Sequence, residues 1–258
     1  MIHKLDPQLL ERPIRILVVG CGGNGSAIVS GLPYLHQALL AFDHPGGLAV
    51  TVIDPDTVSE TNCVRQPFCR TEIGLSKATV LMHRINSFWG LNWQGMQAEI
   101  QQIARSAEVD LVIGCVDTRK ARRAIDAWVR KSRVLYWLDL GNSSSTGQFV
   151  LGQPNNDVNR KRKNRLRTVA ELYPEILVPD DKHDRQPACS AAEALTRQEP
   201  FINQNLACQA LAMLTQLLRR GSLSFHGGFC NLSTGQLMPL LYRGIPLARA
   251  GTRSVWLK

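Results

Sequence analysis

The sequence of 258 residues has no apolar run that approaches the roughly 18 residues of a membrane-spanning helix. Its start, MIHKLDPQLLERP, also lacks the apolar core of a secretory signal peptide. Charged residues make up only 20% of the chain and hydrophobic residues 44%, a balance that excludes an intrinsically disordered protein. We therefore expect a soluble, cytoplasmic protein without a membrane partner.

Cysteines are few and are not paired in the sequence. There are seven, an odd number, and no two are spaced as C-x-x-C. This pattern argues against a disulfide framework and against the common zinc sites. We expect reduced thiols and no structural zinc.

Acidic residues are scarce relative to basic ones. The chain has 21 Asp and Glu against 30 Lys and Arg, a formal net charge of +9. The densest basic stretch is RKRKNRLR at 160–167, and no aromatic residue within it could stack on bases. Nucleic acid is therefore a poor candidate partner. The stretch is either a solvated surface or a docking site for an acidic protein.

The apolar pattern of the first half predicts alternating strands and helices. Short apolar runs predict buried strands at 14–19, 48–54, 109–115 and 134–140. Longer mixed segments predict helices at 26–42, 74–89 and 119–132. This alternation predicts an α/β fold with a parallel sheet and helices on both faces.

The second half begins differently and then becomes regular again. Residues 152–187 are rich in Asn, Asp, Pro and Arg and predict a surface excursion with a short helix near 166–173. From Ser190 regular structure resumes, with a buried helix at 201–221 and two strands within 225–242. We expect one domain over 1–258, made of a nucleotide-binding half (14–140), a crossover (152–189) and a helix-and-hairpin half (190–258).

A glycine-rich turn joins the first predicted strand to the first predicted helix. The glycines are Gly20, Gly22, Gly23 and Gly25. Such a turn lets the backbone approach phosphates at a helix N-terminus, and Asp54 ends the next strand, where it can bind ribose hydroxyls. The pattern indicates nucleotide binding without choosing ATP over NAD. Tight packing of strand against helix is the alternative reading.

Polar residues that could serve a triphosphate follow Asp54. They are Asp56, Asn62, Arg65, Gln66 and Lys77. Cations there could offset charge that develops during phosphoryl transfer, although a solvated loop would look the same. Asp117 ends the third strand, where a carboxylate could bind Mg²⁺, and it could also serve as the N-cap of the next helix.

Taken together, these motifs resemble the ThiF/MoeB/HesA superfamily, the adenylating enzymes that include the ubiquitin-activating enzymes. The shared pattern comprises the glycine turn, Asp54-x-Asp56, Asn62-x-x-Arg65-Gln66, Gly74-x-x-Lys77 and Cys115-x-Asp117. The sequence around 185–245 is most similar to that of the ThiF-type proteins of bacterial PRTRC systems.

The resemblance implies a Rossmann-like ATP-binding domain with a mixed, mostly parallel sheet of about eight strands, usually in a homodimer. It implies Mg-ATP-dependent adenylation of the C-terminal carboxylate of a small ubiquitin-like protein that ends in Gly. By position, Asp54 would hold the ribose and Asp117 the Mg²⁺. Asn62, Arg65 and Lys77 would contact phosphates, with Arg65, Lys77 and Asp117 acting in catalysis.

Cys189, in QPACSAAEAL, lies where ubiquitin-activating relatives carry the cysteine that accepts the acyl group as a thioester. A helix N-terminus and Arg185 could lower the pKa of its thiol, and a small buried cysteine is the alternative.

Relatives also send an N-terminal Arg into the partner's ATP site. Only 19 residues precede Gly20 here, so we expect Arg12 or the basic stretch to replace it, or weaker activity. A NAD-dependent oxidoreductase and a catalytically weakened scaffold remain alternatives.

Overall fold

An eight-stranded sheet forms the centre of the computed structural model, which describes residues 2–178 and 199–242. Its strands, in spatial order, are β10 (Gln236–Leu241), β9 (Phe225–Asn231), β7 (Thr146–Gly152), β6 (Tyr136–Asn142), β5 (Leu111–Gly114), β2 (Ile14–Val19), β3 (Leu48–Ile53) and β4 (Gln94–Met96). Neighbours from β6 to β4 are parallel, and those from β10 to β6 are antiparallel. The predicted mixed, mostly parallel sheet is confirmed.

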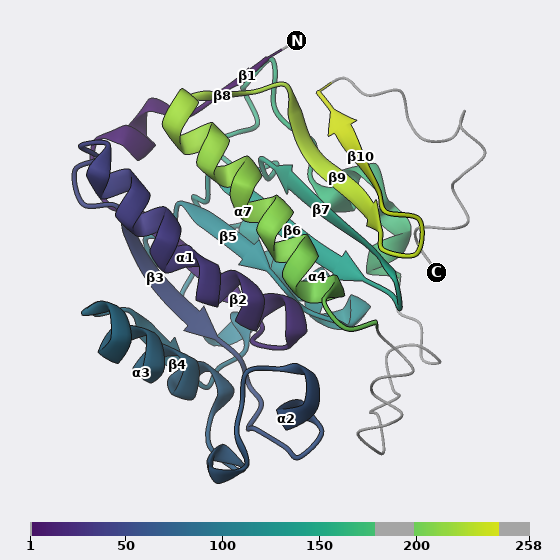
Figure 1. Ribbon diagram of the computed structural model, residues 1–258. Coiled ribbons are helices and arrows are strands. Elements are labelled where there is room, and N and C mark those ends of the chain that lie inside the picture. The colour runs from purple at the N-terminus through teal and green to yellow at the C-terminus, as the bar shows by residue number, and fades with distance from the viewer. Residues whose placement is uncertain (1, 179–198, 243–258) are drawn as a thin grey trace.

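Helices cover both faces of this sheet, as predicted (Figure 1). One face packs against α1 (Gly23–Ala41), α3 (Lys77–Trp89) and α7 (Ile202–Arg220). The other packs against α4 (Arg119–Val129), α5 (Val169–Leu172) and the 3₁₀ helices η3 (Ile100–Gln102) and η4 (Pro174–Leu177). The remaining short elements are α2 (Asn62–Arg65), η1 (Pro7–Leu10), η2 (Arg70–Glu72) and the pair β1 (His3–Lys4) and β8 (Ser222–Leu223).

The local sequence explains the best-predicted elements. β2 is the apolar run IRILVV, and a strand between two helical layers needs apolar residues on both faces. In α7 the apolar positions of one face, from Ile202 to Leu217, are buried against the sheet. Gly221 ends this helix with a φ of +67°, the left-handed conformation that favours glycine.

Several expected boundaries differ from the structure. α1 begins at Gly23, inside the glycine turn, rather than at Ser26, so the turn itself supplies the first helical residues. No strand was predicted between the fourth strand and the excursion at 152–187, whereas β7 lies there as a further central strand. β4 was also missed; it is a short strand at the sheet edge with exposed ends. The expected restart at Ser190 lies outside the described residues.

The basic stretch at 160–167 is neutralised in part by acidic residues of the chain itself. Arg162 pairs with Asp6, Arg165 with Glu171 at 2.6 Å, and Arg160 with Asp157 at 3.2 Å. Nearby, the Asn156 and Asn159 side-chain amides donate to carbonyls at the start of β6. These contacts fasten the excursion to the amino end of the parallel strands, so the stretch is not simply a solvated surface.

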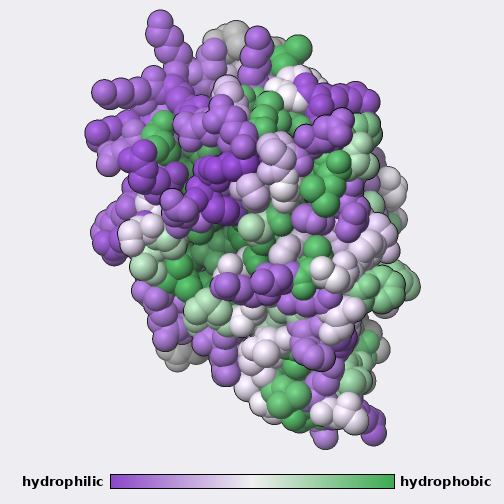
Figure 2. Space-filling view, turned by 90° about the vertical axis from the view of Figure 1, so that its left-hand side faces the viewer, coloured by the Kyte–Doolittle hydropathy of each residue, from purple (hydrophilic) through white to green (hydrophobic). Residues whose placement is uncertain are grey.

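The outer surface is mixed in polarity. Figure 2 shows the side of the molecule to the left in Figure 1, where hydrophilic side chains gather in the upper part and hydrophobic ones are scattered below. Within residues 2–178 and 199–242, no helix is both long and apolar enough to cross a membrane.

Candidate nucleotide-binding site

The glycine turn brings the ends of β2 and β5 together. Gly20 has a φ of +97°, and a Cβ there would lie 2.8 Å from the Cys115 carbonyl oxygen. At Gly25 a Cβ would lie only 1.8 Å from the Gly20 carbonyl oxygen. Both positions therefore require glycine. β3 lies on one side of β2 and β5 on the other, so this is the point where strand order reverses and α/β proteins bind ligands.

The N-terminus of α1 opens directly at this point. Its N-cap is Gly22, and no side chain caps the helix. The first backbone N–H groups of a helix have no partner within it, and they carry the positive end of the helix dipole. A Cβ at Gly22 would meet nothing within 4 Å, so space is open there. This terminus is suited to an anion such as a phosphate.

Asp54 lies beside the turn, at the end of β3. Its side chain is buried and accepts hydrogen bonds from the backbone N–H of Cys21 and, at 2.8 Å, from that of Asp56. Burial raises the pKa of Asp54, and these N–H groups counter that effect. The carboxylate is thus fixed in position, and its remaining lone pairs are free to accept ligand hydroxyls.

Asp56 and Lys77 form an ion pair next to Asp54. Lys77 Nζ lies 2.9 Å from Asp56 Oδ2, with the lysine side chain 8% exposed and the aspartate 66% exposed. The backbone N–H of Lys77 also donates to the Asp56 carbonyl. Three of the predicted residues, Asp54, Asp56 and Lys77, therefore lie together at the carboxyl end of β3.

Asn62 and Gln66 lie in the α2 segment, beside α1. The Asn62 side-chain oxygen accepts from the backbone N–H and the hydroxyl of Ser59, both at 2.9 Å, so it shapes its own turn. Gln66 Oε1 is buried and has no hydrogen-bond partner among the described residues. The Arg65 side chain lies outside the described part of the structure.

Asp117 follows β5 and is exposed. The alternative N-cap role is wrong, because Thr118 caps α4 through a hydrogen bond from Ala121 N–H to Thr118 Oγ1 at 3.1 Å. Within residues 2–178 and 199–242 the Asp117 carboxylate makes no hydrogen bond or ion pair. It is therefore available to a cation.

A structural metal centre is not assembled in the described part of the chain, where no three His, Cys, Asp or Glu side chains converge. A single carboxylate nevertheless fits Mg²⁺, which usually takes one or two carboxylates together with waters and substrate phosphates. Asp117 near the open α1 terminus meets that requirement.

The cysteines at the site are poor nucleophiles. Cys21 and Cys115 are buried, and burial raises the pKa of both thiols, with Asp54 adding to the effect at Cys21. Both stay protonated near neutral pH, in line with the absence of a predicted role. Cys189 lies outside the described residues.

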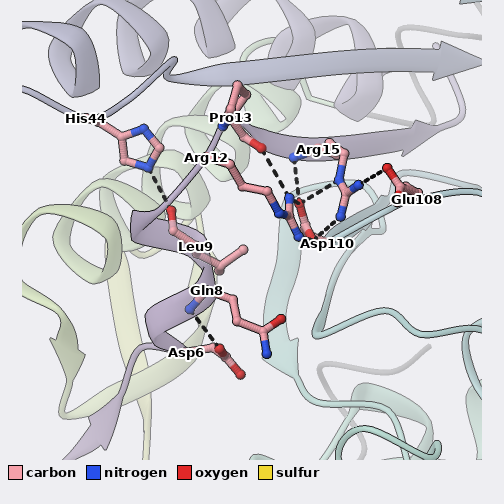
Figure 3. Close-up of polar contacts among 9 residues, drawn as sticks. All are labelled: Asp6, Gln8, Leu9, Arg12, Pro13, Arg15, His44, Glu108 and Asp110. Atoms are coloured by element: carbon pink, nitrogen blue, oxygen red, sulfur yellow. Dashed lines mark hydrogen bonds and ion pairs between the residues drawn. The ribbon is translucent and has the colours of Figure 1, made fainter.

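Arg12 cannot complete this site within its own chain. Its guanidinium donates to Asp110 Oδ2 and Oδ1 at 2.7 and 2.8 Å, and Arg15 binds the same carboxylate (Figure 3). These residues lie at the starts of β2 and β5, whereas the glycine turn and Asp117 follow their ends. Arg12 is therefore engaged away from the site of its own chain, and its expected role in the site of a partner subunit stays a prediction. The basic stretch is fastened at that far end too.

A buried ion pair that was not predicted from the sequence lies next to the site. Arg122 in α4 and Asp139 in β6 have side chains that are 8% and 0% exposed, and Arg122 Nε lies 3.1 Å from both Asp139 carboxylate oxygens. Burial raises the pKa of Asp139 to about 6, and the Arg122 charge counters this. A signal was present: Asp139 interrupts the apolar run VLYWLDL, and a carboxylate in a buried strand needs a cationic partner.

A groove of about 930 Å³ runs along α1 and α7 beside the site. Its lining is mostly apolar and includes Tyr34, Leu211 and Phe201. At the site end it is lined by Ser26, in the first turn of α1, and by Gln66. Gln66, whose buried side-chain oxygen has no hydrogen-bond partner among the described residues, is thus part of the groove lining.

Comparisons with known proteins agree with this geometry. The model of the ThiF family matches residues 4–239. No curated protein gave a significant match. Among solved structures, selenomethionine PaaA is similar with a TM-score of 0.58 and 13% identity, over 90% of this chain and 65% of that chain.

E. coli MccB is similar as well. Its complex with succinimide gives a TM-score of 0.58 at 15% identity, and its complex with ATP gives 0.56 at 16%. Each covers 89% of this chain and 64% of MccB. The chain thus spans less than two thirds of these proteins, and at such low identity the likeness concerns the fold.

Proposed function

The chain belongs to the ThiF family, and we propose that it uses ATP to adenylate a carboxylate. The main support is that the uncapped N-terminus of α1 opens between two carboxylates. One is the buried Asp54, at the position that binds ribose in such folds, and the other is the exposed, unpaired Asp117. A dehydrogenase needs a carboxylate such as Asp54 but has no use for Asp117 or Lys77. The crystal structure of MccB with ATP supports ATP as the nucleotide.

In this proposal each residue acts on one part of the nucleotide. Asp54 accepts hydrogen bonds from the ribose hydroxyls, and the glycine turn from Gly20 to Gly25 receives the phosphates on backbone N–H groups. Lys77 and Arg65 offset the charge that develops as the α–β phosphoanhydride breaks, and Asn62 and Gln66 orient phosphate oxygens. Asp56 holds the Lys77 ammonium in place.

Asp117 is the residue that would hold Mg²⁺. Bound there, the ion would neutralise phosphate charge and favour departure of pyrophosphate. The fit rests on an exposed carboxylate with no competing cation among the described residues.

The proposed acyl substrate is the C-terminal carboxylate of a small ubiquitin-like protein that ends in Gly, as in PRTRC-type systems, with the enzyme acting as a homodimer. A carboxylate oxygen attacks the α-phosphorus, the bond to the β-phosphate oxygen breaks, and an acyl-adenylate and pyrophosphate form.

A second step on Cys189 is part of the proposal. Its thiolate would attack the acyl carbon, form a thioester and release AMP, with the thiol proton passing to solvent. Cys189→Ala should then keep adenylation and lose a thiol-sensitive conjugate. A conjugate that persists in this variant would assign Cys189 a structural role.

Pyrophosphate exchange into ATP, measured with the partner protein, tests the activity. We expect exchange in the wild type and a loss of at least about 100-fold in Asp117→Ala, since removing one preorganised charge contact typically costs that much. The control is Asp157→Ala, an exposed aspartate at the opposite end of the sheet. Full exchange in Asp117→Ala would remove the metal assignment while leaving adenylation in place.

A further inference from the structure

The buried Arg122–Asp139 pair reaches the backbone that carries Asp117. Besides its two contacts with Asp139, the Arg122 guanidinium donates from Nη2 to the Val116 carbonyl oxygen at 3.0 Å. Val116 directly precedes Asp117. The Arg122 backbone N–H also donates to the Thr118 carbonyl at 3.1 Å. The Arg122 side chain therefore holds the β5–α4 loop at the residue before Asp117, and the bond to Thr118 is a backbone bond of the first turn of α4.

The sheet is shaped around this pair. A Cβ at Gly114 in β5 would lie 3.2 Å from Asp139 Oδ1, and one at Gly141 in β6 would lie 3.1 Å from Arg122 Nη2. The Gly141 Cβ would also lie 2.6 Å from the Gln148 amide nitrogen. The guanidinium consequently has little room to adopt another position.

Packing alone does not require such a pair. Burying two charges is costly, and replacing a buried ion pair by apolar side chains of similar volume is often neutral or stabilising. An apolar pair would fill the same space but could not bind the Val116 carbonyl. The contact with the loop is thus the property that only the charged pair supplies.

We propose that Arg122, held by Asp139, is a positioning residue that fixes the Val116–Thr118 backbone and so presents the Asp117 carboxylate to the nucleotide-bound cation. This inference rests on the proposed function for the role of Asp117. It assigns Arg122 no contact with the substrate. Its effect passes through the backbone carbonyl of Val116.

The first test concerns the loop without any ligand. Arg122→Met/Asp139→Leu removes the pair and keeps the volume, and amide hydrogen exchange reports on the loop. We expect the amides of Ala121 and Arg122, which bond to Thr118, to exchange at least about tenfold faster, with α1 unchanged. Unchanged exchange at these amides would overturn the proposal, whether or not the protein binds a nucleotide.

The second test concerns the cation. Calorimetry compares Mg-ATP with ATP in EDTA, and we expect the double variant to lose about tenfold in affinity for Mg-ATP but less than about twofold for metal-free ATP. Equal losses in both, or none, would contradict the positioning role. A wild type that binds no ATP would instead contradict the proposed function. Hydrogen exchange would still show whether Arg122 and Asp139 hold the β5–α4 loop in place.

Two further variants guard against misfolding and nonspecific effects. Arg122→Lys keeps the charge beside Asp139, but one ammonium cannot reproduce the planar fork that binds the carboxylate and Val116 together. This variant should therefore fold and show the same selective loss of affinity for Mg-ATP. Arg130→Met breaks the partly exposed Arg130–Asp126 pair of the same helix and should leave both readouts unchanged.

Discussion

The carboxylate of Asp54, at the end of β3, accepts a hydrogen bond from the backbone N–H of Cys21, in the turn after β2. This bond joins the ribose side of the candidate site to its phosphate side. Asp54 is 33 residues away in sequence, yet parallel pairing of β2 with β3 aligns the two strand ends. The relationship makes Asp54 both a structural tie and a candidate ligand.

Asp54→Asn should weaken ATP binding by about 10- to 100-fold, because a charged hydrogen bond is worth about 1.5–3 kcal/mol. The measurement is calorimetric titration of wild type and variant with ATP and with 2′,3′-dideoxy-ATP. Wild type should prefer ATP, and the variant should have lost this preference. A variant that still distinguishes the two nucleotides would show that Asp54 does not bind the ribose.

Gly25→Ala should destabilise the fold, although alanine normally favours a helix over glycine by about 1 kcal/mol. The new methyl group would overlap the Gly20 carbonyl oxygen, and overpacking of this kind costs roughly 1–3 kcal/mol. Urea unfolding measures the change. Gly22→Ala is the matched control, since a Cβ there is free of contacts and should leave stability within about 0.5 kcal/mol. Equal effects at the two positions would contradict the described turn.

Lys77→Met should reduce pyrophosphate exchange by at least about 100-fold through the lost charge. Thermal stability should change little, because Asp56, the partner of Lys77, is mostly exposed and such pairs contribute about 0–1 kcal/mol. Lys131→Met, at an exposed lysine beyond α4, is the control. A large fall in melting temperature together with normal exchange would make Lys77 a structural residue.

Stability should depend on pH through His3. Burial, with the nearby His226 and Arg162 charges, lowers the pKa of His3 to about 4. Tyr136 Oη accepts the Asp6 N–H, which leaves its own proton for Nε2 of a neutral His3. Between pH 6.5 and about 4 the unfolded chain binds a proton that the folded chain does not. The free energy of unfolding should therefore fall as pH falls through this window, by up to about 3 kcal/mol.

Urea unfolding between pH 4 and 7 measures this dependence. His3→Gln should flatten the slope, whereas His83→Gln, at an exposed position, should not. An unaltered slope in His3→Gln would show that other groups govern the dependence.

The sequence predicted those parts of the fold that depend on local patterns. The run IRILVV, the apolar face of α7 and its terminal Gly221 needed no tertiary information. β4 was not predicted because the three residues Gln94–Met96 are too few to show an apolar pattern, and only pairing with β3 makes them a strand.

The candidate site was predictable where strand ends carry polar residues. Asp54, Asp56 and Lys77 do lie together, because parallel strands place their carboxyl ends at one edge. Arg122 was not predictable from its basic helix, where arginines usually face solvent; only the position of Asp139 inside an apolar strand explains its burial. The fate of Arg12 also depended on a distant partner, Asp110.

Calorimetric titration with Mg-ATP and with NAD distinguishes an ATP-dependent adenylating enzyme from a NAD-dependent oxidoreductase. We expect the wild type to bind Mg-ATP at least about tenfold more tightly than NAD, a difference of about 1.4 kcal/mol. We also expect Asp117→Ala to reduce the affinity for Mg-ATP but not for ATP in EDTA. Tighter binding of NAD, or no binding of Mg-ATP, would contradict the proposed function.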